Sequence, residues 1–414
     1  MDVDIAIVGG GPAGVATALF FAAAAPRLID RIVVLEKERY PREKICAGAV
    51  GARADRLLDR IGVRVDVPSA PVRGFSVLTS RGLLRERASS PVGRVVRRVE
   101  FDRAFADVAR ARGVRILEGA RVTEIAFDDG GVRLDTSIGE LRARAVVGAD
   151  GVGSFVRRAV GMPRGRWLAQ VVEVDTPAID ADPSRDFLHF DLTDDSLPGY
   201  VWDFPTVVDG EPLVCRGIYA LRPDPSIPGA PPPISDAPDV GARLVDRLSR
   251  LGVGGGRVKR FAERGLALND AVARPRALLV GEAAGIDPAL GEGIAQAIFY
   301  GATAGPYLAG CLDRGELSFA GWRSALMQSR VGLDLRIRTR LTPWLYGWLR
   351  PLAERWVAGS RDLAIAGMRY FAGERVPRRR IAGAALALGG AAAREWIEAS
   401  VVRPKFRQDF GPRR

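Results

Sequence analysis

The stretch "DIAIVGGGPAGVATALFFA" (residues 4–22) joins a short apolar run to a glycine-rich turn and then to a helical run. Gly9, Gly11 and Gly14 fit the spacing G-x-G-x-x-G. In such a turn the first glycine permits the bend, the second lets a pyrophosphate approach the backbone, and the third lets helix and strand pack closely. The start of the helix then offers unpaired N–H groups to the phosphates. The stretch therefore predicts a strand–turn–helix unit that binds a dinucleotide.

A second apolar stretch supports this prediction. The segment "RIVVLEKE" (31–38) ends on Glu36, which follows Gly14 by 22 residues. An acidic residue at about this distance is expected to bind the ribose hydroxyls of an adenosine group. Ala13 in the turn and Lys37 after the strand are expected to contact the same cofactor. Because both halves of the pattern are present, a bound nucleotide is favoured over a glycine turn without a ligand.

Two later stretches indicate which dinucleotide is bound. Both "RAVVGADGVGSFVRRAVG" (144–161) and "RALLVGEAAGIDPALGEGIAQAIFYG" (276–301) predict an apolar strand, a turn with an acid, and a helix. They resemble the second and third signatures of FAD-dependent oxidoreductases with the para-hydroxybenzoate hydroxylase fold. The resemblance implies FAD as cofactor, with Glu282 replacing the aspartate that contacts the ribityl chain. It also implies that Gly293 and Ile294 lie beside the flavin ring, where a helix N-terminus stabilises negative charge.

Two further segments resemble parts of the same fold. The segment "RRVEFDRAFADVARARG" (97–113) resembles the R-x-x-F-D motif of these proteins, which implies that Arg98 faces FAD. The alternative is an amphipathic helix with a solvated arginine. In "EGARVTEI" (118–125), the resemblance implies that the backbone of Val122 meets the adenine side of the cofactor.

The segment after the second strand narrows the family. The stretch "YPREKICAGAV" (40–50) resembles the K-x-C-G-G segment of the geranylgeranyl reductase family, with alanine in place of the first of its two glycines. The resemblance implies that this segment contacts the cofactor through Lys44, Cys46, Ala47, Gly48 and Ala49.

An aromatic stretch resembles a second motif of that family. The sequence "YVWDFP" (200–205) keeps the spacing of the motif Y-x-W-x-F-P, which lines the substrate cavity over the flavin. Alternation with a period of two puts the three rings on one face of a strand. Their alternative place is the protein's own core. The resemblance implies a wall for a long apolar, isoprenoid-like substrate, formed by Tyr200, Trp202, Phe204 and Pro205.

The implied reaction is the reduction of carbon–carbon double bonds. Reduced FAD supplies a hydride to one alkene carbon, and a proton reaches the other from water, Cys46 or Tyr200. Cys46 has a structural alternative as a small buried packing residue. FAD must be reduced by an external electron donor, for which ferredoxin, a reductase and NAD(P)H are the alternatives.

Two other functional classes remain open. One is a flavin-dependent monooxygenase or halogenase that acts on an aromatic or polyketide metabolite. Within this alternative, halogenation is less favoured than monooxygenation, because a halogenase should carry W-x-W-x-I-P, whereas residues 200–205 read "YVWDFP". The other is a flavin-bound protein that sequesters a lipid without catalysis, an interpretation supported only by Glu282.

The distribution of charge excludes one class of partner and suggests another. The chain has 414 residues and a net charge of +12, and residues 321–414 hold 19 Lys and Arg against 7 Asp and Glu. The whole excess therefore lies in the last quarter, which argues against nucleic-acid binding. Arginines alternate there with tryptophans, as in a helix on a membrane surface. The alternative is a helical lid with solvated arginines. Without a signal-peptide pattern, we expect a cytoplasmic protein. If the C-terminal region is a membrane-surface helix, the protein is expected to associate with a membrane through it.

These segments predict an α/β fold with three parts. The first is a discontinuous, Rossmann-like FAD-binding domain of the para-hydroxybenzoate hydroxylase type, at residues 1–70, 95–165 and 260–330. An inserted β-sheet substrate domain is expected at residues 71–94 and 166–259. Residues 331–414 form a helical C-terminal region. A single histidine and three dispersed cysteines argue against a multi-histidine or multi-cysteine zinc site.

Overall fold

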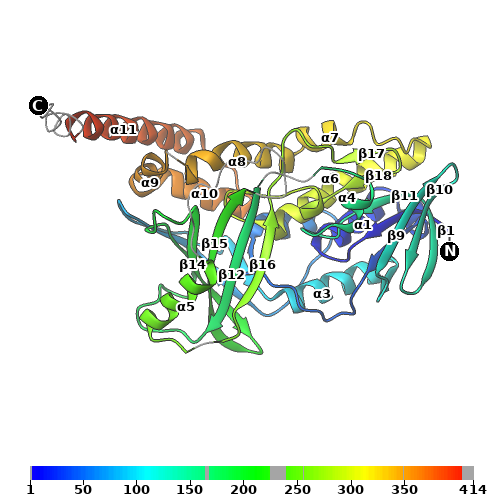
Figure 1. Ribbon diagram of the computed structural model, residues 1–414, viewed down its shortest axis with the longest axis horizontal. Helices are drawn as coiled ribbons and strands as arrows, with labels where there is room; N and C mark the ends of the chain where they lie inside the picture. Colours follow the sequence, from blue (N-terminus) through cyan, green and yellow to red (C-terminus); the bar gives the residue numbers. More distant parts are fainter. Residues whose placement is uncertain (1, 164–166, 224–238, 255, 348, 403–414) are drawn as a thin grey trace, which may run out of the picture.

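The computed structural model describes residues 2–163, 167–223, 239–254, 256–347 and 349–402. Within these residues the chain forms an eight-stranded sheet, a seven-stranded sheet, a three-stranded sheet and a helical C-terminal region (Figure 1). Residues 403–414, the end of the predicted helical region, lie outside the described residues.

The eight-stranded sheet has a parallel core whose strands are continuous apolar runs. All five residues of "IVVLE" in β2 (Ile32–Glu36) are buried, as expected for a parallel strand covered on both faces. The parallel order is β18 (Ala277–Leu279), β11 (Gly139–Gly148), β1 (Asp2–Val8), β2 (Ile32–Glu36) and β8 (Ile116–Glu118). Antiparallel additions are β17 (Ala273–Arg274), β9 (Val122–Asp128) and β10 (Gly131–Thr136).

The register of this sheet brings three distant segments to one edge. Val8 of β1 pairs with Leu35 of β2 on one side and with Gly148 of β11 on the other. The glycine turn, Glu36 and Asp150 therefore all lie at or directly after the carboxyl ends of neighbouring strands. In an open parallel sheet this edge is where ligands bind.

One helix packs on the sheet and a second helix packs closely against the first. Helix α1 (Pro12–Ala24) follows the glycine turn, and α6 (Gly293–Arg314) packs against it. An added Cβ at Gly301 would lie 2.5 Å from Ala16 Cβ, and one at Gly305 would lie 2.4 Å from the Phe21 nitrogen. The two glycines thus let the helix backbones approach each other. Three other elements near this sheet are α3 (Arg98–Ala111), α4 (Phe155–Ala159) and the 3-10 helix η1 (Pro26–Arg31).

The seven-stranded sheet lies beside this unit. Its order is β16 (Lys259–Arg264), β12 (Trp167–Thr176), β15 (Glu211–Pro223), β14 (Gly199–Val208), β13 (Phe187–Asp191), β5 (Gly74–Thr79) and β6 (Gly82–Arg87). Helix α5 (Val240–Leu251) packs on β12 and β15. The predicted boundary at residue 260 falls inside β16, and the division into domains stays a prediction.

A small sheet and the C-terminal helices complete the structure. The small sheet has the order β3 (Ala49–Gly51), β7 (Gly93–Val96) and β4 (Ser69–Val72). Helix α2 (Ala52–Asp59) follows β3 along the chain. The C-terminal helices run along the upper side of Figure 1 and are α7 (Trp322–Gln328), α8 (Arg330–Tyr346), α9 (Arg350–Gly359), α10 (Arg361–Ala372) and α11 (Arg378–Val402). Among the described residues, none of the helices has the length and apolar character to cross a membrane.

Candidate functional site

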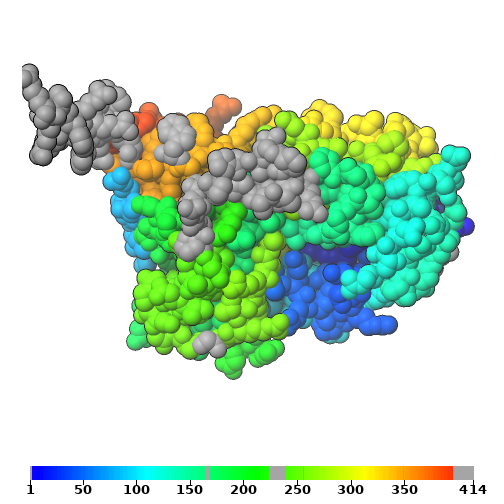
Figure 2. All heavy atoms as spheres, viewed as in Figure 1, coloured from blue at the N-terminus to red at the C-terminus, as the bar shows by residue number. Residues whose placement is uncertain are grey.

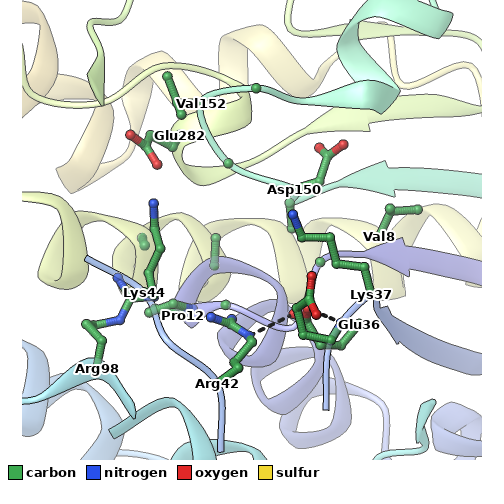
Figure 3. A pocket seen from close by; sticks show the side chains of 18 of the residues that line it. Val8, Pro12, Glu36, Lys37, Arg42, Lys44, Arg98, Asp150, Val152 and Glu282 are labelled. Atoms are coloured by element: carbon green, nitrogen blue, oxygen red, sulfur yellow. Dashed lines mark hydrogen bonds and ion pairs between the residues drawn. The ribbon is translucent and has the colours of Figure 1, made fainter. Parts of the chain in front are cut away.

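A cavity of about 1050 Å³ opens at the carboxyl edge of the eight-stranded sheet. Ligand pockets typically measure roughly 300–1,000 Å³, so it can take a large cofactor. Figure 2 shows a recess whose dark blue floor belongs to the first residues of the chain. Most of the predicted cofactor-binding residues line it, namely Gly9, Gly11, Ala13, Glu36, Lys37, Lys44, Cys46, Arg98, Val122, Glu282, Gly293 and Ile294 (Figure 3).

The three glycines of the turn differ in what requires them. Gly9 has φ of +111°, and an added Cβ there would lie 2.4 Å from the Ala149 oxygen. A Cβ at Gly14 would lie 1.9 Å from the Gly9 oxygen. At Gly11 the nearest atoms are the guanidinium nitrogens of Arg42 and Arg98, at 3.8 and 3.9 Å. The fold itself requires Gly9 and Gly14, whereas the space beside Gly11 fits a ligand phosphate.

Two guanidinium groups face that space. Arg98 donates two hydrogen bonds to Asp102, at 2.6 and 2.7 Å, and Arg42 lies 3.0 Å from the same carboxylate. Arg42 also approaches Glu36 at 3.4 Å. Since these groups are fixed by a buried acid, they offer an ordered positive site suited to a diphosphate. Arg42 was missed by the sequence interpretation, although it lies inside the segment 40–50.

Backbone hydrogen bonds fix the carboxylate of Glu36, at the end of β2, in a position suited to bind a ribose. Glu36 is buried, and its carboxylate accepts hydrogen bonds from the backbone of Gly10 at 2.9 Å and of Glu38 at 3.0 Å. Val122, on β9, lines the same end of the cavity. The residues present therefore fit the adenosine half of a dinucleotide.

The opposite part of the cavity, here called the ring end, is lined by Lys44, Cys46, Phe261, Glu263, Glu282 and Gly293. Burial raises the pKa of the Glu282 carboxyl, and Lys44 and Arg98 oppose that shift. Burial also raises the pKa of the Cys46 thiol, which Arg98 in turn lowers. Glu263 comes from β16, in the second sheet, and no motif of the sequence indicated it.

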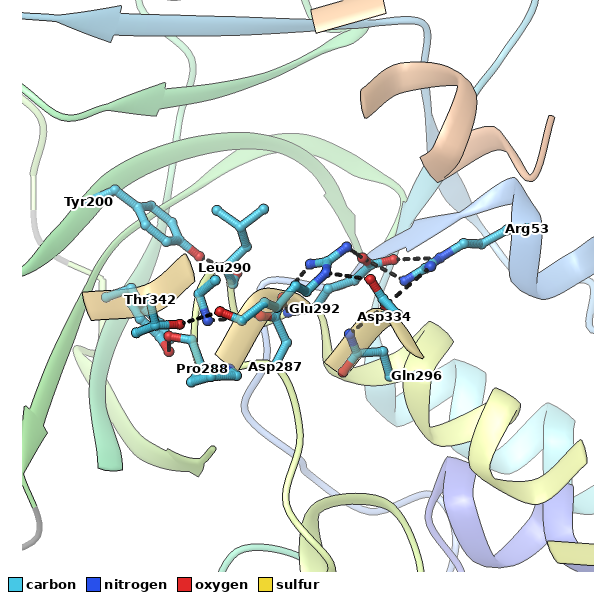
Figure 4. A network of polar contacts seen from close by, with 12 residues as sticks. Arg53, Tyr200, Asp287, Pro288, Leu290, Glu292, Gln296, Asp334 and Thr342 are labelled. Carbon is cyan, nitrogen blue, oxygen red and sulfur yellow. Dashed lines mark hydrogen bonds and ion pairs between the residues drawn. The ribbon is translucent and has the colours of Figure 1, made fainter. Parts of the chain in front are cut away.

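The loop between β18 and α6 is fixed by a network of charged groups. Arg338 of α8 contacts Asp287, Glu292 at 2.9 Å and Asp334 at 2.8 Å. Arg53 of α2 contacts Glu292 at 2.7 Å. Figure 4 shows this network beside the loop that leads to Gly293. Helices α8 and α2 therefore fix the loop that leads to Gly293, which lines the cavity.

Four of the predicted cofactor-binding residues do not line the cavity. An added Cβ at Gly48, where φ is +83°, would lie 1.9 Å from the Val96 oxygen, so Gly48 is required by packing on β7. Gly14 lies in α1, and Ala47 and Ala49 pack against an aromatic cluster.

That aromatic cluster contains the predicted substrate wall. Tyr200, Trp202 and Phe204 are 6%, 3% and 5% exposed, and they pack with Tyr219, Tyr346, Met368 and Phe371. The Tyr200 hydroxyl donates a hydrogen bond to the Leu290 oxygen at 2.5 Å. These rings and Pro205, all on β14, do not line the cavity. Their roles in catalysis and substrate binding stay predictions.

The predicted membrane segment is partly buried and partly exposed. Arg338 lies in the network, and Trp356 donates a hydrogen bond to the Ala384 oxygen. On α8 the apolar residues Leu333, Ile337 and Trp344 are each about half exposed. Trp348 lies outside the described residues.

Comparisons with known proteins support the fold and the cofactor class. The model of the FAD binding domain family matches residues 2–191. Two solved structures share the fold. A geranylgeranyl bacteriochlorophyll reductase-like protein from Thermoplasma acidophilum is 19% identical, with a TM-score of 0.67 over 96% of this chain and 98% of that one. A flavin-dependent brominase is 17% identical, with a TM-score of 0.70 over 95% of this chain and 99% of that one. The predicted fold class is confirmed.

Sequence similarity identifies the family. A digeranylgeranylglycerophospholipid reductase from Methanothrix thermoacetophila is 30% identical over 361 residues, which are 81% of this chain and 87% of the relative. The cofactor is FAD, as the domain match and the lining of the cavity indicate. The chain belongs to the geranylgeranyl reductase family of FAD-dependent oxidoreductases.

Proposed function

We propose that this oxidoreductase reduces carbon–carbon double bonds in the prenyl chains of a lipid. The observation that carries the proposal is the position of Phe261, which lines the ring end of the cavity and also packs against the aromatic cluster. In this proposal an apolar chain that leaves the ring end meets Phe261, which connects the cavity to the cluster that contains Tyr200 and Trp202. The similarity to a digeranylgeranylglycerophospholipid reductase supports the same substrate class.

The residues of the chain have separate tasks in this proposal. Gly11, Arg42 and Arg98 hold the diphosphate of FAD, Glu36 holds the ribose, and Glu282 faces the ribityl side. Bound and reduced FAD supplies a hydride. The apolar rings orient the alkene by shape and exclude water, because an aliphatic chain offers no hydrogen bonds.

Two features of the proposal concern partners. Electrons come to FAD from an external donor, of which ferredoxin, a reductase and NAD(P)H are the candidates. The lipid is taken from a membrane surface that contacts the exposed apolar residues of α8, Leu333, Ile337 and Trp344, with the arginines of the C-terminal region near anionic headgroups.

The test is a single-turnover experiment without oxygen. The bound FAD is photoreduced, and a geranylgeranyl lipid or its fully saturated analogue is added. We expect the unsaturated lipid alone to reoxidise the flavin and to gain two hydrogens per flavin, measured by absorbance and mass spectrometry. Reoxidation only by oxygen, with hydroxylation or halogenation of an aromatic compound, would replace the proposal with the monooxygenase or halogenase alternative.

A further inference from the structure

Glu263 is an acid at the ring end of the cavity that has no part in holding the cofactor's phosphates or ribose. It lies on β16, two residues after Phe261, and both side chains line the cavity with Cys46. Its Oε2 atom is buried and has no hydrogen-bond partner among the described residues. A buried carboxyl oxygen without a partner is costly, so its retention needs an explanation.

The backbone opposite Glu263 leaves room for this carboxyl group. Gly291 has φ of +67°, in the region that favours glycine. An added Cβ at this position would lie 2.7 Å from Oε2 of Glu263 and 3.1 Å from Cε2 of Tyr219. Any side chain at residue 291 would displace the acid, so the loop before α6 and the acid fit one another.

The surroundings of Glu263 favour the protonated form of its carboxyl group. Burial, and next the neighbouring Glu282 and Asp287, raise its pKa well above the usual value, and Lys44 opposes the shift. The titratable groups that interact with it from the elements packed around it are Glu282, Asp287, Lys44, Glu173, Cys46, Tyr200 and Tyr219. Arg338 pairs with Asp287, so burial and the neighbouring Glu282 are the main causes that favour a proton on Glu263.

As a proton donor, Glu263 is better suited than the two other candidates nearby, Tyr200 and Cys46. The Tyr200 hydroxyl already donates to the Leu290 oxygen, and burial raises its pKa well above 10. Burial raises the pKa of the Cys46 thiol above 9. A carboxylic acid is intrinsically more acidic than either, and an alkene needs a strong acid. Glu263 therefore combines acidity, a retained proton and access to the cavity.

We propose that Glu263 is the catalytic acid that protonates the alkene at the ring end. This inference rests on the proposed function. The π bond of the alkene breaks: one carbon receives the hydride supplied by reduced FAD, and the π electrons form a C–H bond between the other carbon and the proton of Glu263. The alkene is reduced by two electrons and FAD is oxidised. The Glu263 carboxylate then regains a proton from water.

The experiment compares Glu263→Gln and Glu263→Asp with the native FAD-bound protein. Glutamine keeps the shape and neutral charge of the protonated acid, so folding and FAD content should be retained. We expect Glu263→Gln to slow reoxidation by a geranylgeranyl lipid at least about 100-fold, since a general acid contributes about 10²–10⁴-fold. Glu263→Asp should recover part of the rate. The native rate should fall as pH rises through the pKa of Glu263, and the residual glutamine rate should not.

A measurement in the oxidised protein without substrate gives an independent readout. The infrared difference between native protein and Glu263→Gln at pH 7 should contain the carbonyl band of a protonated carboxylic acid. The matched control is Glu100→Gln on α3, whose Oε2 is also buried without a partner and whose pKa is raised by burial, but which lies outside the cavity lining. It should leave the reoxidation rate unchanged.

The outcomes separate this inference from the proposed function. If the native chain does not reduce prenyl lipids, the proposed function fails and this inference with it. If the native chain does so and Glu263→Gln keeps its rate, the reductase activity stands and Glu263 is not the acid. An absent carboxylic acid band in the infrared difference would also overturn the inference.

Discussion

Replacing Arg338 by methionine should destabilise the protein by about 3 kcal/mol at pH 7. Removing one partner of a buried ion pair costs about 3–5 kcal/mol, because charge is left without compensation. The low end applies here, since the three carboxylates keep other partners. Arg53 stays within 2.7 Å of Glu292 and 3.5 Å of Asp334, and Asp287 accepts from the Ala289 nitrogen at 2.8 Å. Such a loss is large against a total stability of about 5–15 kcal/mol.

The loss of stability caused by replacing Arg338 with methionine should become smaller at acidic pH. Burial raises the pKa of Asp334, but Arg338 and Arg53 lower it by more, so the pKa lies below its usual value. A depressed pKa in the folded state contributes stability above the unfolded pKa of about 3.9, and this contribution is lost as pH falls through the folded pKa. The variant loses the part of that contribution that Arg338 supplies and keeps the part from Arg53. The difference between native and variant protein should therefore be full at pH 7 and shrink only as pH falls below about 4.

Denaturant unfolding of both FAD-bound proteins from pH 8 to the lowest pH at which they fold would measure this difference. The control is Arg250→Met, which removes an exposed ion pair with Asp246 on α5 and should change stability by less than about 1 kcal/mol. Equal effects of the two substitutions, or a difference that widens on acidification, would refute the argument that Arg338 neutralises a buried acidic cluster.

Three other substitutions test the cavity and the helix packing. Gly11→Val should abolish FAD binding, measured by flavin absorbance, yet leave a folded protein, because φ is −77° there and no atom lies within 3.7 Å of the added Cβ. An unfolded Gly11→Val protein would contradict this. Glu282→Asp should bind FAD at least as well as the native chain, and a tenfold loss in titration, about 1.4 kcal/mol, would give Glu282 its own role. Gly301→Ala should lower the free energy of unfolding by about 1–3 kcal/mol, because the added methyl group overpacks against Ala16. The control Gly310→Ala should stabilise α6. Similar effects of the two substitutions on unfolding would rule out the close contact between α1 and α6.

Most of the fold could be predicted from local sequence. The glycine turn and the apolar strands carry their own signals, since parallel strands are buried on both faces and the turn needs glycine at defined positions. The boundaries of the inserted sheet carry weaker signals. Strand β16, for example, has the sequence "KRFAER", in which charged residues obscure the alternation expected of a strand.

The adenosine half of the site could be predicted and the ring end only in part. Gly11, Glu36 and Arg98 belong to motifs with fixed spacing. Glu263 and Arg338 interact with residues far away in sequence, and neither lies in a motif. An isolated charged residue is usually solvated, so its burial becomes visible only when the sheets and helices are assembled.

The close packing of α1 on α6 has a consequence for how the protein is made. Helix α1 ends at residue 24 and its partner begins at residue 293, so about 270 residues must be synthesised in between. At about 5–20 residues per second, the apolar surface of α1 waits roughly 15–60 s on the ribosome for its cover. The anchor of the loop before α6, Arg338, emerges later still. FAD should therefore be captured only after nearly the whole chain has been translated, and a chain that stalls early should become a client of chaperones.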